Sequence, residues 1–287
     1  MKSVAIGIFD GVHQGHQKIL AEAAKYGPVT ALTFHPHPTS VFAPERTPPF
    51  LVSLEDRIEL LEAHGASEVV VIEFTKEFAS KSPDEFINQV LVESLQAKHV
   101  TVGANFTFGH KASGNADYLV ASGKFGVSAV PLAEDRGSAI SSTRIRSLII
   151  DGDIERANEL LTRSFYLRGP VVHGEKRGRE IGYPTANIGI ADHATIPADG
   201  IYAGWLTVGE HRWKSAISIG TNPTFPGVRG RQVEAYAIGE SGLDLYDKDA
   251  KLEFTHRLRD TLKFNSLDEL LVQMKSDCTK AIVLLER

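Results

Sequence analysis

The chain has 287 residues, 42% hydrophobic and 23% charged, with a formal net charge of −5, a size that allows one large or two ordinary domains. The negative charge argues against a general nucleic-acid binder, which neutralises phosphates with a basic surface. No apolar stretch approaches the roughly 20 residues that cross a bilayer, no signal-peptide pattern follows Met1, and the single cysteine excludes an internal disulfide, so we expect a cytoplasmic protein without a membrane partner.

Strand-like and helical segments alternate from residue 1 to about residue 165. Two helix starts carry N-capping patterns, at Ser53 and at Ser82. This alternation predicts an α/β domain with a parallel sheet, whose ligands bind at the carboxyl ends of the strands. Five short β-rich runs are predicted, namely Val4–Phe9, Val29–Phe34, Glu68–Phe74, His99–Gly103 and Val127–Leu132.

The first run leads directly into a glycine-rich turn with two histidines, and then into a helix predicted from about His16 to Lys25. Gly11 and Gly15 let the backbone approach a ligand, and the N-terminus of a helix attracts an anion. If the helix begins near Val12, His13 and His16 share a face and can both touch one phosphate chain. Alone, such a histidine pair is more often accidental, and zinc is disfavoured because the only cysteine lies far along the chain.

After a predicted helix at Ile154–Leu161, the pattern changes to β-runs separated by turn residues. It predicts an antiparallel barrel or sandwich, followed by a helix whose capping box begins at Ser266. The domain boundary is therefore expected near residue 165, which divides the chain into residues 1–165 and 166–287. The runs are Tyr166–His173, Thr185–Ile190, Ile201–Val208, Lys214–Ile219, Val233–Ile238 and Leu252–Leu258.

The string G-x-F-D-G-V-H-x-G-H, between its strand and helix, resembles the H-x-G-H signature of the nucleotidyltransferase superfamily. In this form it is similar to the FMN adenylyltransferase domain of bacterial bifunctional riboflavin kinase/FAD synthetases. Three more segments resemble that domain: Thr33–Pro38 and Val102–Gly109, where His35 and Ala104 depart from acidic residues, and Ile140–Arg146, which matches without departure. The resemblance implies a Rossmann-like domain that transfers an adenylyl group from ATP to FMN, giving FAD and pyrophosphate.

The same resemblance implies roles for individual residues. His13 and His16 would be catalytic, holding the triphosphate and offsetting charge on the departing pyrophosphate. No protein base is required, because the FMN phosphate is already an anion. Asn105 could orient the acceptor or ribose and Phe108 could stack on the isoalloxazine ring, although one of Phe106 and Phe108 is expected in the core. The other expected nucleotide- or flavin-binding residues here are Gly7, Phe9, Asp10, Gly11, Gly15, Ser142, Thr143 and Arg146.

Residues 174–187 resemble the G-x-x-R-G-x-x-[LI]-G-[FY]-P-T-A-N signature of riboflavin kinase, which implies a β-barrel kinase domain. Thr185 and Asn187 are two residues apart at a strand start, so both side chains face one side and could coordinate Mg²⁺ or a phosphate. Residues 218–225 and Val233–Tyr236 also resemble the kinase, as do Leu258–Asp260, Lys263, Phe264 and Asp277. The other expected binding residues are Gly174, Arg177, Gly178, Gly182, Pro184, Arg259 and Phe264.

Glu234 is the expected catalytic base of the kinase, with Asp277 and Glu253 as alternatives. The 5′-hydroxyl of riboflavin has a proton to lose, and a carboxylate base typically raises the reaction rate by about 10²–10⁴-fold.

The implied partners are riboflavin, FMN and ATP with Mg²⁺, and FMN and FAD are substrate and product rather than prosthetic groups. An adenylyltransferase with another acceptor, such as pantetheine phosphate, leaves the second half unexplained. The intact His13, His16, Thr185, Asn187 and Glu234 count against a non-catalytic flavin-binding protein. The sequence leaves the oligomeric state open.

Overall fold

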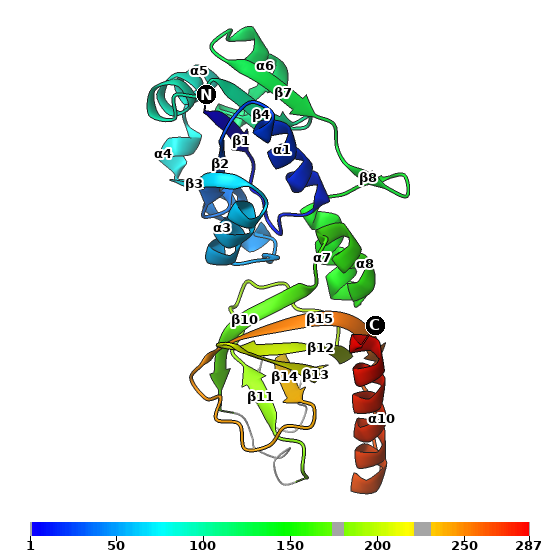
Figure 1. Ribbon diagram of the computed structural model, residues 1–287. Helices are drawn as coiled ribbons and strands as arrows, with labels where there is room; N and C mark the ends of the chain where they lie inside the picture. Colours follow the sequence, from blue (N-terminus) through cyan, green and yellow to red (C-terminus); the bar gives the residue numbers. More distant parts are fainter. Residues whose placement is uncertain (1, 174–180, 221–230, 287) are drawn as a thin grey trace. The chain divides into compact units, whose positions relative to one another are not determined.

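The computed structural model describes residues 2–173, 181–220 and 231–286, in two compact units, Met1–Ser142 and Thr143–Arg287 (Figure 1). The first unit contains the predicted parallel sheet, with strand order β3-β2-β1-β4-β7. On one side of β1 the next strands are β2 and β3, and on its other side they are β4 and β7. The strand order therefore reverses between β1 and β4. Ligands of α/β sheets bind at this switch point, beyond the carboxyl ends of the strands. The strands are β1 (Ser3–Ile6), β2 (Val29–His35), β3 (Ala66–Glu73), β4 (His99–Gly103) and β7 (Gly126–Val130).

Both faces of the central part of this sheet are buried. In β1 the side chains alternate, because Val4 and Ile6 join one apolar cluster and Ala5 joins the other. The cluster around Ala5 contains residues of α1 (Gln14–Ala24) and α3 (Leu54–Ala63), and the opposite cluster contains residues of the π-helix η2 (Phe86–Ser94) and of α6 (Ala116–Ala121). Helical cover on both faces explains why the central strands β1, β2 and β4 are almost wholly buried.

Short elements complete the first unit. The predicted capping box at Ser82 is confirmed, since Ser82 and Glu85 exchange hydrogen bonds with each other's backbone. Ser53 caps α3 by accepting from Asp56 N at 3.0 Å. The remaining elements are α2 (Pro38–Phe42), η1 (Pro44–Arg46), α4 (Lys76–Ala79), α5 (Pro83–Glu85), β5 (Thr107–Phe108), η3 (His110–Ala112), β6 (Gly114–Asn115), β8 (Glu134–Asp135) and β9 (Ser138–Ala139).

The second unit is a closed antiparallel barrel with strand order β10-β11-β14-β13-β12-β15, so the barrel alternative of the sequence analysis is confirmed. Closure pairs every strand on both sides and leaves no free edge. Gly204 is required where β12 meets β15, because a Cβ there would collide with the carbonyl oxygen of Glu253. The strands are β10 (Phe165–Val172), β11 (Thr185–Ile188), β12 (Gly200–Val208), β13 (His211–Gly220), β14 (Gln232–Ala237) and β15 (Asp249–Arg259).

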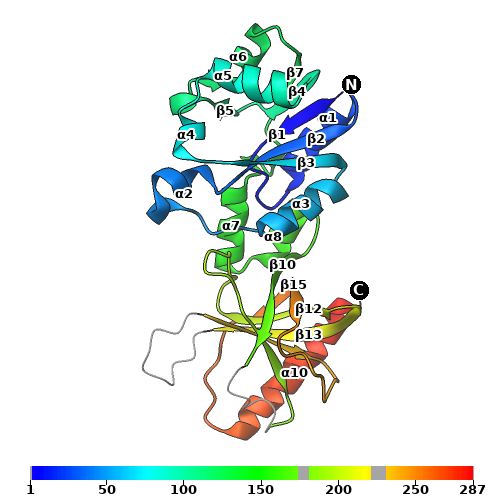
Figure 2. The ribbon, with the colours of Figure 1, turned by 90° about the vertical axis from the view of Figure 1, so that its left-hand side faces the viewer.

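Helices flank the barrel. The expected last helix is α10 (Leu267–Leu285), which packs against β12, β13 and β15 (Figure 2). Its cap, Ser266, accepts from Glu269 N at 3.2 Å, while the Glu269 carboxylate accepts from Asn265 N at 3.0 Å. Before the barrel lie α7 (Ser142–Asp151) and α8 (Ile154–Leu161). In the part of the chain that the structure describes, no helix has the length and apolar character needed to span a bilayer.

Asn158 fastens α8 to the barrel. Its Nδ2 donates to the carbonyl oxygen of Phe254 at 2.9 Å, and its Oδ1 accepts from Phe165 N at 2.6 Å. One amide side chain therefore satisfies backbone groups of both β15 and β10. The apolar face of α8, which includes Ile154 and Leu161, is completely buried.

We expect Asn158→Ala to lower the free energy of unfolding of the barrel by about 2–4 kcal/mol, because it leaves two backbone groups unsatisfied. Both tryptophans, Trp205 and Trp213, lie in the barrel, so urea unfolding followed by tryptophan fluorescence reports on this unit. Glu159→Gln, an exposed change on the same helix, is the control and should change the midpoint little. Equal midpoints for Asn158→Ala and the control would contradict this role.

Candidate active sites

The turn after β1 is held in an unfavourable backbone conformation. Phe9 and Val12 have φ values of 55° and 39°, and Gly11 has 80°. A non-glycine residue in this region costs on the order of 1–3 kcal/mol and persists only where the surroundings hold it. Both side chains are completely buried in the cluster around Ala5. Packing of Phe9 and Val12 therefore compensates for the strain and fixes the turn.

A buried charge pair reinforces the same turn. The Asp10 carboxylate is 1% exposed and accepts from Leu51 N at 3.0 and 3.2 Å, while its backbone oxygen accepts from Ser142 Oγ at 2.9 Å. Arg57, 2% exposed, donates to the carbonyl oxygen of Phe34 at 3.2 Å. Burial lowers the pKa of Arg57, and the negative charge of Asp10 opposes this effect. The contacts of Asp10 therefore place it as a support of the turn.

The two histidines lie together at the start of α1. The helix begins at Gln14, so the condition that it begins near Val12 is not met. His13 is instead the N-cap, and its Nδ1 accepts from Gly15 N at 3.2 Å, which places the proton of the neutral ring on Nε2. The rings of His13 and His16 stack with centroids 3.7 Å apart. The two side chains are thus brought together, by the cap rather than by the helical repeat.

Two of the predicted glycines, Gly15 and Gly7, leave space for the rings of His13 and Phe9. A Cβ at Gly15 would lie 3.1 Å from Cε1 of His13, and a Cβ at Gly7 would lie 3.0 Å from the Phe9 ring. Both distances are shorter than ordinary contacts. Gly7 and Gly15 therefore have a packing role in the turn, besides any approach to a ligand.

The pKa of His16 is lowered from its ordinary value. Burial, together with the electrostatic effects of the neighbouring His13 and Arg57, lowers its pKa well below 6.5, so the ring is neutral at pH 7. Among the described residues, no partner accepts from or donates to its buried Nδ1. A neutral ring offers hydrogen bonds rather than a full positive charge. Any help that His16 gives to a phosphate group in this state comes from an N–H donor.

The segment after β4 reaches the same edge of the sheet. Asn105 is exposed there, whereas Phe108 is 8% exposed and belongs to the cluster around Val4 and Ile6. The ring of Phe106 stacks on Phe108 with centroids 5.6 Å apart and is less buried. The expectation that one of the two phenylalanines is in the core is confirmed. Phe106, not Phe108, has the more accessible ring.

The predicted phosphate-gripping residues of α7 lie on one helix. Ser142 contacts the turn through Asp10, as described above. Thr143 and Arg146 follow in the second unit, where Arg146 Nη1 donates to Thr143 Oγ1 at 3.3 Å. Arg146 is only 9% exposed, so little of its side chain is accessible to solvent.

The barrel presents the second candidate site on the outer face of β11 and β14. Asn187 pairs with Glu234 in the strand register, and Thr185 pairs with Tyr236. Thr185 Oγ1 donates to Glu234 Oε2 at 3.4 Å. Thr185 and Asn187 therefore face the same side, as predicted, and the carboxylate of Glu234 joins them there. Residues Gly174, Arg177 and Gly178, and the segment 221–225, lie outside the described residues; Gly182 and Pro184 immediately precede β11.

Arg259 connects the end of β15 to α10. Its Nε and Nη2 donate to the carboxylate of Asp277 at 2.7–3.1 Å, and its Cζ lies 6.0 Å from the centre of the Phe264 ring. Gln273 donates to the same carboxylate at 2.8 Å. The Asp277 carboxylate is therefore occupied by Arg259 and Gln273. These contacts argue against Asp277 as the catalytic base.

Glu253, the other alternative base, also lies in ion pairs. Its carboxylate is 3.0 Å from Arg212 Nη2 and 3.6 Å from Lys251 Nζ.

Among the described residues, no group of three or more His, Cys, Asp or Glu side chains could hold a metal ion. Hydroxyl, amide and carboxylate oxygens, as on Thr185, Asn187 and Glu234, are the ligands that Mg²⁺ prefers when it also binds phosphates.

Comparison with known families agrees with two sites in two halves. Residues 1–144 match the FAD synthetase family model, and residues 161–285 match the riboflavin kinase model. The bifunctional riboflavin kinase/FMN adenylyltransferase of Bacillus subtilis (strain 168) is 36% identical over 291 residues, which cover 98% of this chain and 92% of that protein. The chain belongs to the family of bifunctional riboflavin kinase/FMN adenylyltransferases.

Other relatives of this bifunctional family agree. The Escherichia coli (strain K12) protein of the same name is 33% identical over 283 residues, covering 96% of this chain and 90% of that protein. A crystal structure from Streptococcus pneumoniae, published as a macrolide-efflux protein, superposes with a TM-score of 0.88 at 34% identity, covering 96% of this chain and 92% of that one. The fold of this chain is thus shared with that crystal structure over nearly the full length.

Sequence reasoning missed Arg57, a charged residue buried beside the histidines. The segment Glu55-Asp56-Arg57 has the composition of a solvent-exposed first helical turn, and no local pattern indicates burial. The one signal for a buried arginine is that the buried Asp10 needs a positive charge nearby. Which arginine supplies that charge depends on the tertiary fold, so the spacing of residues along the sequence does not identify Arg57.

The lowered pKa of His16 predicts a direction of pH dependence. Below pH 6.5 the unfolded chain binds a proton at His16 that the folded chain does not bind, so the free energy of unfolding falls as the pH decreases through that range. NMR titration of the His16 Cε1 proton, assigned by its loss in His16→Gln, should give a midpoint well below 6.5. The decrease in Tm on acidification should be smaller in His16→Gln than in the wild type. A midpoint at or above 6.5 would contradict the burial effect.

Proposed function

We propose that this chain makes FAD from riboflavin in two steps, each using ATP. The barrel phosphorylates riboflavin to FMN, and the α/β domain then joins an adenylyl group of ATP to FMN, releasing pyrophosphate. The observation that most supports this is the convergence of Thr185, Asn187 and Glu234 on one face, from segments far apart in the sequence. The family membership and the names of the relatives point to the same pair of reactions.

In the kinase step, Mg²⁺ enters with ATP as part of the substrate. Thr185 and Asn187 offer it oxygen ligands, and the ion neutralises charge on the phosphates. Glu234 accepts the proton of the riboflavin 5′-hydroxyl as that oxygen bonds to the γ-phosphorus and ADP leaves. The hydrogen bond from Thr185 holds the Glu234 carboxylate on the substrate side of β14. Gly174, Arg177, Gly178, Gly182 and Pro184 are assigned to the nucleotide and flavin, as are Arg259 and Phe264.

In the adenylyl step, a phosphate oxygen of FMN bonds to the α-phosphorus of ATP, and the bond to pyrophosphate breaks. The attacking phosphate needs no base, so the protein acts through donors that stabilise the transferring group. His13 and His16 are assigned to the triphosphate, together with Ser142, Thr143 and Arg146. Asn105 is assigned to the acceptor or ribose, and Phe106 rather than the buried Phe108 to the flavin. Gly7, Phe9, Asp10, Gly11 and Gly15 shape the turn around these groups.

The two activities divide near residue 165, into residues 1–165 and 166–287. The family models leave residues 145–160 between them, a stretch that includes all of α8 except Leu161. Because α8 is fastened to the barrel by Asn158, the kinase half depends on this helix for its stability.

A reducing compartment suits a chain with one cysteine, and we place the enzyme in the cytoplasm.

We expect Glu234→Gln to slow FMN formation by about 10²-fold or more, because the amide cannot accept the proton. Riboflavin and ATP binding should persist, and the variant should still make FAD from supplied FMN. Glu253→Gln, another glutamate on an outer barrel face, is the matched comparison and should keep normal rates. Chromatographic measurement of FMN and FAD distinguishes the steps. Normal FMN formation by Glu234→Gln, or a large loss in Glu253→Gln, would move the base elsewhere.

We expect His16→Ala to lower FAD formation from FMN by at least tenfold, since it removes a donor next to the triphosphate. Riboflavin phosphorylation should remain near wild type. His64→Ala is the matched control, because His64 lies at the C-terminal end of α3. Unchanged FAD synthesis by folded His16→Ala would refute the assignment of this turn.

A further inference from the structure

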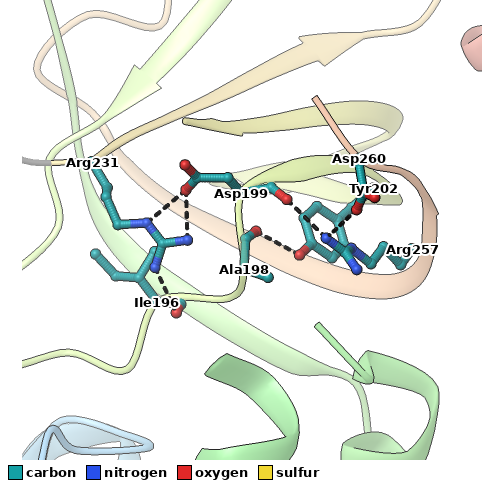
Figure 3. Close-up of polar contacts among 7 residues, drawn as sticks. All are labelled: Ile196, Ala198, Asp199, Tyr202, Arg231, Arg257 and Asp260. Carbon is teal, nitrogen blue, oxygen red and sulfur yellow. Dashed lines mark hydrogen bonds and ion pairs between the residues drawn. The ribbon is translucent and has the colours of Figure 1, made fainter. Parts of the chain in front are cut away.

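A polar network lies where the chain enters β14 (Figure 3). Nε and Nη2 of Arg231 donate to the same carboxylate oxygen of Asp199, at 2.8 and 2.6 Å. Nη1 of Arg231 donates to the carbonyl oxygen of Ile196 at 3.3 Å. All described donors of this guanidinium therefore point at one short segment, Ile196–Asp199.

Arg257 holds that segment from the other side. Its Nη2 donates to the backbone oxygen of Asp199 at 2.9 Å and lies 2.7 Å from Oδ1 of Asp260 (Figure 3). Two glycines leave space for it, because a Cβ at Gly152 would come within 2.9 Å of Cζ of Arg257 and one at Gly200 within 3.3 Å of its Nε. Tyr202 Oη also donates to the carbonyl oxygen of Ala198 at 2.6 Å. Asp199 is thus a fixed anchor for Arg231.

The ion pair crosses the end of β13. Asp199 directly precedes β12, and Arg231 directly precedes β14. In the register, Gly200 pairs with Ile219 of β13, while Gln232 pairs with Gly220 of β13. The Asp199–Arg231 pair therefore links two strands that are both neighbours of β13 but not of each other.

Glu234 follows Arg231 by three residues and sits at the last rung between β14 and β11. That ladder consists of Tyr236, Ala235 and Glu234, and it ends at the pair of Asn187 with Glu234. Gln232 and Val233 pair only with β13. Within the described chain, the start of β14 is thus held on one side by β13 and at its tip by the ion pair with Asp199.

We infer that Asp199 and Arg231 are positioning residues for Glu234, fixing the start of β14 so that the carboxylate meets the riboflavin hydroxyl. This inference rests on the proposed role of Glu234 as the kinase base. Both side chains are partly exposed, at 44% and 32%, and exposed ion pairs contribute little to global stability. A displacement of about 1 Å at a reacting group, by contrast, can cost about 10²-fold in rate. Loss of the pair should therefore affect the reaction more than the fold.

The first test measures riboflavin phosphorylation by the full chain carrying Asp199→Asn or Arg231→Gln. We expect kcat to fall about tenfold, with the KM for riboflavin changed less than about threefold and Tm nearly unchanged. FAD formation from supplied FMN should stay normal. Arg212→Gln is the matched control, because Arg212 also forms an ion pair with a barrel carboxylate, that of Glu253, at 3.0 Å. Unchanged kcat in both test variants would overturn the inference.

The second test asks whether the effect passes through Glu234. In a Glu234→Gln background, adding Asp199→Asn should lower kcat by less than twofold, since there is no base left to position. The same tenfold loss in that background would overturn the inference and indicate a general disturbance of the barrel. The conservative variant Arg231→Lys, which keeps one donor and the charge, should recover part of the rate. If Glu234→Gln alone retains normal kcat, the proposed base has failed; if it is slow while Asp199→Asn is normal, only the positioning role has failed.

Discussion

The proposed kinase site depends above all on the register between β11 and β14. Side chains alternate along a strand, so a shift of one residue would turn Glu234 into the barrel core and bring Val233 or Ala235 to the outer face. The observed pairing of Asn187 with Glu234 keeps the amide and the carboxylate on one side. Because β14 is also paired with β13 and the barrel is closed, neither strand can slide without breaking its other ladder.

The proposed adenylyl site depends on a different constraint, the strained turn after β1. In this turn, residues of the apolar core are next in the chain to residues of the candidate site. Phe9 and Val12 pack in the core, while His13 caps α1. Asp10 and Arg57 place opposite charges beneath the turn, and the arginine also helps to keep His16 neutral. The site thus combines a fixed backbone with donors whose charge depends on their surroundings. In the proposed adenylyl step, the incoming triphosphate adds negative charge next to His16, which favours protonation of the ring as the substrate binds.

Local patterns were sufficient for most of the fold. The structure places β4 at His99–Gly103 and α8 at Ile154–Leu161, as the sequence predicts, because each is an apolar pattern with clear flanking signals. The same period-two rule placed Thr185 and Asn187 on one face. The start of α1 was harder, since histidine is not among the preferred capping residues and Val12 adopts a left-handed conformation. Contacts between distant segments, such as Asp10 near Arg57 and Asp199 with Arg231, leave no periodic signal, and Phe108 could be separated from Phe106 only by its observed burial.

Closure of the barrel has a consequence for synthesis of the chain. β10 is the first barrel strand to leave the ribosome, yet one of its two partners is β15, the last strand. Until residue 259 has emerged, the nascent kinase half has open strand edges that can pair with other chains. The sheet of the first unit has all its strands by Val130, so it can fold while the barrel is still incomplete. Because the barrel strands follow the first unit in the chain, the open-edged intermediate exists only during translation of the second half.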